Sequence, residues 1–239
     1  MDAATPPATP PTLQRFDRTE RALHWATAAL FLVLMLTAVP LYMGSVAAFI
    51  GRRDLLARIH VWCGVALPIP LVLSVLGRWG DGLRRDIRRF SRWSAAEVDW
   101  LRSFGRGGLP QLDKFNPGQK LNAVFVAGTI VVMLGTGSIM RWFGPFPDSW
   151  RTGATFVHDL LATAVFVVVI GHIGFALAHR ESLRSIFTGR IGRDWAGRHA
   201  PGWLDEQDGR AGPGGAAVQM PRGSRAGSQS SSVTAARKA

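Results

Sequence analysis

Four apolar segments constrain the fold of this chain more than any other feature of its sequence. They cover residues 23–43, 55–76, 121–140 and 154–178 and consist mostly of Leu, Val, Ala, Ile and Phe. Each has about 20 residues, roughly the length that an α-helix needs to cross the hydrocarbon core of a bilayer. The mean hydropathy is only +0.13 because polar residues gather in the loop 78–120 and after residue 178. The sequence therefore predicts an all-α membrane protein with a four-helix transmembrane bundle.

The basic residues predict the orientation of this bundle. Arg and Lys number ten in the loop 78–120 and ten from residue 179 onward, against three in residues 44–58 and two in residues 141–155. By the positive-inside rule, both termini and the long middle loop are cytoplasmic and two short loops face outward. The formal charge of +12 is thus explained by topology, and the sequence contains no nucleic-acid-binding motif.

Four histidines lie inside the apolar segments. An imidazole inside a bilayer is costly without a partner, so each is a candidate functional residue. The predicted topology places His24 and His172 near the cytoplasmic face and His60 and His158 near the outer face. His172 follows His158 by 14 residues, which is about 21 Å along a helix and only about 40° around it. One face of the fourth helix can therefore supply one member of each pair.

These pairs predict two haems b, an outer one held by His60 and His158 and an inner one held by His24 and His172. Two neutral imidazoles on opposite faces of a porphyrin fill both axial positions of the iron, which favours electron transfer over dioxygen binding. The alternatives are structural hydrogen bonding and a proton path. His179, at the interface, and His199, in a polar segment, are expected to be solvated.

Other chemistry is limited in this sequence. The single cysteine, Cys63, excludes an internal disulfide and a cysteine-ligated iron–sulfur cluster. No carboxylate pair, nucleophile triad or phosphate-binding loop is recognisable at a credible position. The glycines Gly64, Gly171 and Gly174, near the histidines, would let a flat macrocycle approach the backbone, whereas Gly128, Gly135 and Gly137 in the third span are expected only to allow close helix packing.

Three positions have the spacing of helix starts. Asp17 and Glu20 form a potential capping box ahead of His24, and Asp54 is a possible cap before His60. Asn116 can cap the third span, with Pro117 at the first helical position and a glutamine three residues after the cap.

The chain resembles the cytochrome b (gamma) subunit of respiratory formate dehydrogenase, within the di-haem membrane-anchor cytochromes, over roughly residues 15–203. The resemblance rests on Arg21, His24 and Trp25 in the first span, Arg58 and His60 in the second, the run KFNPGQK from Lys114 to Lys120, and the two histidines of the fourth span. It implies a subunit of the bacterial inner membrane that takes electrons from an iron–sulfur (beta) partner and passes them through two haems b to quinone near the cytoplasmic side. A molybdopterin-containing or other catalytic (alpha) subunit would carry the dehydrogenase active site.

The same resemblance implies a quinone pocket beside the inner haem. The matching asparagine, glycine and glutamine of the family correspond to Asn116, Gly118 and Gln119, together with His172. This role is compatible with helix capping, because a helix start exposes unpaired amides and a side-chain amide can bond a quinone carbonyl.

Several alternatives remain open at this level. The same architecture could serve a nickel–iron hydrogenase or a thiosulfate or tetrathionate reductase, and other classes are a haem-free membrane anchor and a proton-coupled transporter. Residues 1–14 are expected to be a disordered leader, residues 15–203 the cytochrome domain, and residues 204–239 a disordered polar tail. The middle loop suits either a short basic helix on anionic lipid or a solvated basic face, through Arg84, Arg85, Arg88, Arg89 and Arg92.

Overall fold

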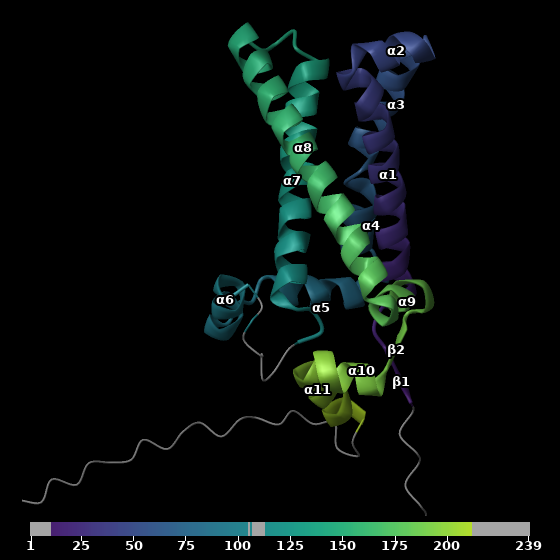
Figure 1. Ribbon diagram of the computed structural model, residues 1–239, viewed down its shortest axis with the longest axis vertical. Helices are drawn as coiled ribbons and strands as arrows, with labels where there is room; N and C mark the ends of the chain where they lie inside the picture. Colours follow the sequence, from purple (N-terminus) through teal and green to yellow (C-terminus); the bar gives the residue numbers. More distant parts are fainter. Residues whose placement is uncertain (1–10, 105, 107–112, 212–239) are drawn as a thin grey trace, which may run out of the picture.

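Four long apolar helices stand side by side in the computed structural model, which describes residues 11–104, 106 and 113–211 (Figure 1). They are α1 (Arg18–Tyr42), α3 (Arg53–Ala66) continued by α4 (Ile69–Leu76), α7 (Pro117–Arg141) and α8 (Asp148–Ala178). All four are long and apolar enough to cross a membrane. The predicted bundle of four membrane-spanning helices is confirmed.

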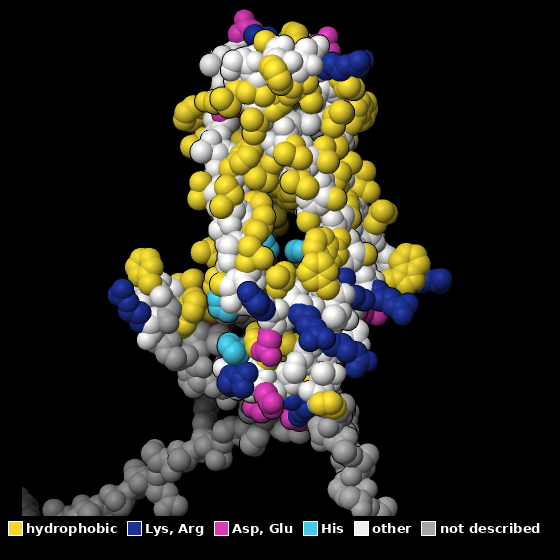
Figure 2. Space-filling model, turned by 45° about the vertical axis from the view of Figure 1, so that its right-hand side comes forward, with side chains coloured by type: hydrophobic (Ala, Val, Ile, Leu, Met, Phe, Trp, Pro, Cys, Tyr) yellow, Lys and Arg dark blue, Asp and Glu magenta, His cyan; other side chains and the backbone are white. Residues whose placement is uncertain are grey.

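Most apolar side chains of this bundle lie on its outer surface, and few are buried inside it. Leu36, Leu73, Val131 and Ile170 are all exposed, and Figure 2 shows hydrophobic side chains over most of the height of the helices. A helix that is hydrophobic on its outer face needs an apolar surrounding, which the bilayer supplies. Inside the bundle α1 packs along α3, and α7 along α8.

The second span is interrupted, which the sequence analysis did not anticipate. Helix α3 ends at Ala66 and α4 begins at Ile69, with Leu67 and Pro68 between them. Proline has no backbone N–H and its ring crowds the preceding turn, so the helical hydrogen-bond ladder breaks here. The prediction that Asp54 caps this span is also wrong: the helix starts one residue earlier, and Asp54 lies in its first turn.

Short elements gather at the end of the bundle where α1 and α7 begin and α8 finishes, here called the terminal end (Figure 1). Helices α5 (Asp81–Phe90) and α6 (Ala95–Arg102) form the middle loop, and α9 (Arg180–Thr188) follows α8. The opposite end has the short helix α2 (Gly44–Ile50). The basic run of the middle loop forms helix α5, which suits both alternatives given for this loop, and Gly82, Leu83 and Asp86 face inward.

A small unit, here called the terminal unit, lies beyond the terminal end of the bundle, at the bottom of Figure 1. It changes two predicted boundaries. It consists of β1 (Thr12–Gln14), paired antiparallel with β2 (Arg190–Gly192), and of α10 (Arg193–His199) and α11 (Pro201–Ala211). Its core is formed by Ile191, Ala196, Ala200 and Trp203.

The ranges predicted for the disordered leader and the disordered tail are therefore both too long. Strand β1 occupies residues 12–14, and α11 continues past the predicted boundary at residue 204, where Leu204 packs on the core of the terminal unit. The polar composition of the tail obscured these few apolar anchors. The two short strands also depart from a purely helical fold. Residues 1–10 and 212–239 of the predicted leader and tail lie outside the described part of the chain.

Candidate functional site

The first histidine pair lies toward the terminal end, between α1 and α8. The ring centres of His24 and His172 are 6.4 Å apart, and the ring planes meet at 49°. His24 is held near the start of α1 by a capping box: Asp17 Oδ1 accepts from the Glu20 backbone N–H at 2.8 Å, and Glu20 Oε2 accepts from the Asp17 N–H at 2.6 Å. This predicted box is confirmed, and it fixes the helical phase of His24 one turn later.

The second pair lies closer to the opposite end, between α3 and α8. The ring centres of His60 and His158 are also 6.4 Å apart, with the planes at 62°. The structure thus brings together the same two pairs that helix depth suggested. His179 and His199 stay apart from both pairs and are exposed, as expected, and each contacts a backbone carbonyl one turn earlier.

Both separations fit one haem iron between two imidazoles. An imidazole nitrogen binds a metal at about 2.0 Å and lies about 1.15 Å from its ring centre, so two axial ligands have ring centres about 6.3 Å apart. In the described residues no group of three or more His, Cys, Asp or Glu side chains is placed to hold a metal ion. A porphyrin supplies four ligands of its own, so haem iron requires only the two that each pair offers.

Two threonines orient the rings of the second pair. Thr37 Oγ1 lies 2.9 Å from His60 Nδ1, and Thr136 Oγ1 lies 3.0 Å from His158 Nδ1. Each hydroxyl also donates to the carbonyl four residues earlier, Val33 O at 2.7 Å and Val132 O at 2.8 Å.

This arrangement favours one tautomer of both rings. A hydroxyl has one hydrogen, and when it goes to the backbone carbonyl the threonine oxygen accepts from the imidazole. Nδ1 then carries the proton and Nε2 keeps the lone pair that a metal needs. Sequence reasoning missed both threonines, because a threonine in a membrane helix commonly bonds its own helix.

Glycine 137 has a more specific place than the helix packing expected for it. A Cβ added there would lie 3.3 Å from His158 Cε1, so a larger residue would press on the imidazole ring. In contrast, a Cβ on Gly171 or Gly174 would meet no other atom within 4 Å. The α8 backbone beside His172 can therefore be approached closely, as the macrocycle hypothesis for these glycines requires.

The predicted quinone residues begin α7 at the terminal end. Asn116 Oδ1 accepts from the Gln119 N–H at 2.9 Å, and Gln119 Oε1 accepts from the Asn116 N–H at 3.1 Å. The predicted capping box is confirmed, with Pro117 in the first helical position and Gly118 beside the Asn116 oxygen. Of the two side chains the box uses only the oxygens, so the side-chain NH2 groups of Asn116 and Gln119 do not take part in it.

A buried ionic cluster lies at the same end and joins three segments. Lys114, two residues before Asn116, contacts Glu20 Oε1 at 3.1 Å and Asp86 Oδ2 at 2.5 Å. All three side chains are less than 10% exposed. Such a cluster ties α1, α5 and the start of α7 together beside the first histidine pair. Sequence reasoning did not find it, because the members are far apart along the chain.

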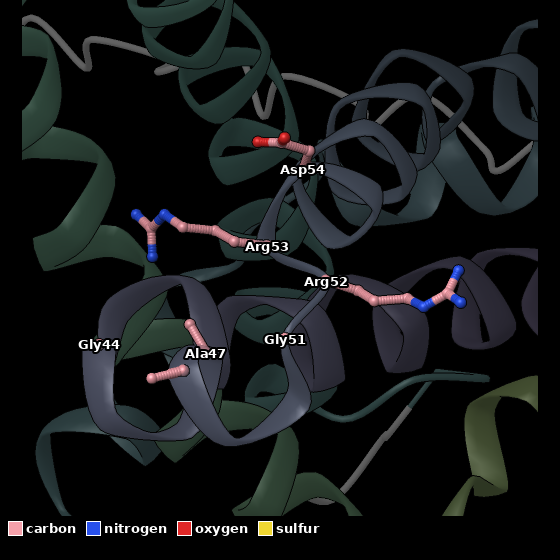
Figure 3. Close-up of a pocket in the computed structure, with 7 residues that line it drawn as sticks. Gly44, Ala47, Gly51, Arg52, Arg53 and Asp54 are labelled. Atoms are coloured by element: carbon pink, nitrogen blue, oxygen red, sulfur yellow. The ribbon is translucent and has the colours of Figure 1, made fainter.

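A hollow of about 470 Å³ at the opposite end has none of these features. Figure 3 shows its lining by α2 and the start of α3, with the Arg52 and Arg53 side chains pointing in opposite directions. Its charged groups do not converge on one point, and we assign no ligand to it. The candidate site therefore consists of the two histidine pairs and the start of α7.

Comparison with known proteins gives consistent matches. Residues 15–189 match the family model described as prokaryotic cytochrome b561. The formate dehydrogenase cytochrome b556 subunit of Haemophilus influenzae (strain Rd) is 25% identical over 196 residues, 78% of this chain and 80% of that protein. The cytochrome b556(fdo) subunit of Escherichia coli K12 is 25% identical over 208 residues, which cover 82% and 93%. Its nitrate-inducible counterpart, the cytochrome b556(Fdn) subunit, is 22% identical over 195 residues, covering 78% and 88%.

Proposed function

The chain belongs to the prokaryotic cytochrome b561 family, and from this premise we propose that it is the membrane cytochrome b subunit of a formate dehydrogenase. It is a multi-pass protein of the bacterial inner membrane, and as a cytochrome b it binds haem b. The proposal adds that it holds two haems, one at each histidine pair, and delivers electrons from an iron–sulfur subunit to quinone. The relatives named above, all formate dehydrogenase subunits, favour a formate dehydrogenase as the partner enzyme over a nickel–iron hydrogenase or a thiosulfate or tetrathionate reductase.

The observation that carries this proposal is the equal separation of two imidazole pairs along α8. A histidine with only a structural role is not expected to have a second imidazole with its ring centre 6.4 Å away, and this arrangement occurs twice here. Two bis-histidine haems would supply one-electron carriers in series across the membrane. The threonine bonds at His60 and His158 hold these rings with Nε2 free to ligate, which a haem-free anchor or a proton-coupled transporter does not require.

Each end of the bundle would have its own partner. The pair His60 and His158 lies toward the end with α2, where an iron–sulfur (beta) subunit would dock and electrons would enter. Formate oxidation would belong to a molybdopterin-containing or other catalytic (alpha) subunit, since within the described residues we recognise no site for that chemistry. This chain would then supply the membrane anchor and the electron path.

Quinone would be reduced at the terminal end. The start of α7 offers the side-chain NH2 groups of Asn116 and Gln119 to a quinone carbonyl, with Gly118 between them and His172 as the neighbouring haem ligand. If the terminal end is cytoplasmic, as the positive-inside rule predicts, electrons move inward against the membrane potential. That costs about 2.3 kcal/mol per charge per 100 mV, which an exergonic donor such as formate can supply.

A haem count tests the proposal directly. We expect the purified full-length protein to show two haems b per chain by pyridine haemochrome assay, and a dithionite-reduced minus oxidised spectrum of two low-spin centres. A well-folded preparation without haem would refute the electron-transfer function and leave the histidines as structural or proton-path residues.

The quinone role of Gln119 can be separated from its role in capping. Glutamate at this position preserves the capping box but lacks the side-chain NH2 group. The variant Gln119→Glu should therefore keep both haems and slow quinone reduction by about tenfold, the effect of losing about 1.4 kcal/mol of hydrogen bonding. Haem reoxidation by a short-chain quinone measures this rate. Gln119→Ala removes both features, and if it alone slows the reaction, capping accounts for the residue.

A further inference from the structure

The Glu20 and Asp86 carboxyls form a buried acidic pair that the electron path does not use. Their side chains are 8% and 7% exposed, and both contact the single ammonium of Lys114. Helix α5 reaches α1 closely here: a Cβ on Gly82 would lie 3.3 Å from Glu20 Cδ and 2.4 Å from Asp17 Oδ2. The glycine therefore lets the two carboxyl-bearing helices meet.

The cations near this pair do not neutralise its two carboxyls fully. Asp86 Oδ1 is 3.7 Å from Arg89 Nε, but Arg89 also binds Asp113 and Glu206, so its charge is shared among three acids. Arg15, from the segment before α1, contacts Ser182 and the Lys114 carbonyl and acts on Asp86 only through space. Among the residues that the structure describes, Lys114 is thus the one cation that contacts both members of the pair, and Asp17, the cap of α1, adds a further acid.

Asp86 can consequently keep a proton near neutral pH. Burial, followed by a hydrogen bond with Glu20, raises the pKa of Asp86 to about 7, while Lys114 opposes the rise. Glu97, a partly buried acid at the same end, behaves differently. Its burial acts to raise the pKa, but the hydrogen bond from Lys120 at 2.6 Å and the capping contact with Ser94 outweigh it, and the pKa is lowered.

The pair is also placed beside the proposed quinone residues. Glu20 is one turn before His24 on α1, about 6 Å along the helix axis. Lys114 is two residues before Asn116, where α7 and the proposed pocket begin. The acidic pair therefore adjoins both the proposed electron donor and the proposed acceptor.

We propose that the Glu20–Asp86 pair is a proton reservoir for quinone reduction, an inference that rests on the proposed function. Conversion of a quinone to a quinol takes two electrons and two protons. The electrons come from the haem chain, and the pair supplies one proton: an O–H bond of the carboxyl pair breaks and an O–H bond forms on the quinone oxygen. The pair is then reprotonated from the cytoplasmic solvent, and the second proton comes from solvent by another route.

Infrared spectroscopy tests whether the pair holds a proton, independently of activity. In the full-length protein, a protonated-carboxyl absorption should disappear as pH rises from 6 to 8. It should be missing in Asp86→Asn and unchanged in the matched control Glu97→Gln. A wild-type protein without such a band, or a band that survives in Asp86→Asn, would overturn the proposal.

Quinone kinetics test whether the reaction uses that proton. After haem reduction and removal of excess reductant, reoxidation by a short-chain naphthoquinone is followed in the haem absorbance. We expect the wild-type rate to fall as pH rises through about 7, and Asp86→Asn to be about tenfold slower at pH 6 and nearly independent of pH. Asp86→Glu should restore the pH dependence, and Glu97→Gln should retain it.

The outcomes separate this inference from the proposed function. If Asp86→Asn binds haem normally and reacts with quinone at the wild-type rate at every pH, the reservoir is overturned and the electron path stands. If the wild-type haem is not reoxidised by quinone at any pH, the proposed function fails, and the reservoir fails with it.

Discussion

Replacing His60 with alanine is expected to remove one haem of two and leave the other intact. His60 and His158 face each other with ring centres 6.4 Å apart, and loss of one imidazole takes away half of the axial ligation that this pair offers. The pyridine haemochrome count should fall from about two to about one per chain. Changing His24 should remove the other haem, because His24 faces His172.

Two comparisons make this result specific. Thr37→Val keeps His60 but removes the oxygen that accepts from its Nδ1–H, so the haem should remain with a shifted midpoint potential. The double variant His60→Ala with His158→Ala should lose no more haem than either change alone. A His60→Ala protein that keeps two low-spin haems would refute the pairing, and one that loses both would show that the two sites do not fold independently.

Helix periodicity explains why the histidine pairs could be predicted from sequence. Each histidine is fixed in depth by its distance from the ends of an apolar segment, and His158 and His172 share one face of α8. The capping boxes at Asp17 and Asn116 could be predicted equally well, because a box depends on residues three positions apart. These features are local, so no knowledge of the tertiary structure was needed.

Contacts between distant segments could not be predicted in the same way. Lys114 joins residues 20 and 86 because α5 folds back against α1, and no periodic pattern in the sequence specifies that return. The acceptor role of Thr37 depends on which helix faces α1 and at what height. Helix α11 continues past residue 203 because Leu204 packs on the core that includes Trp203, although the surrounding composition indicates disorder.

Replacing Lys114 with methionine is expected to destabilise the protein by about 3–5 kcal/mol at pH 8, because it leaves the acids of a buried cluster without their shared cation. Methionine is of similar length and cannot pair with either carboxyl. The loss should be smaller at pH 6. Lys114 normally acts to lower the pKa of Asp86, so its removal lets that carboxyl keep a proton at higher pH.

The pH dependence of this loss has a definite sign. An acid whose pKa is raised in the folded state contributes most to stability below its unfolded pKa, and that contribution falls as pH rises toward the folded pKa. For Asp86 the window runs from its usual value of 3.8 to about 7 in the wild type, and further upward without Lys114. Thermal unfolding of the purified protein at pH 6 and pH 8 measures the difference. Adding Asp86→Asn to Lys114→Met should recover part of the stability at pH 8, and an equal loss at both pH values would show that Lys114 acts through packing rather than charge.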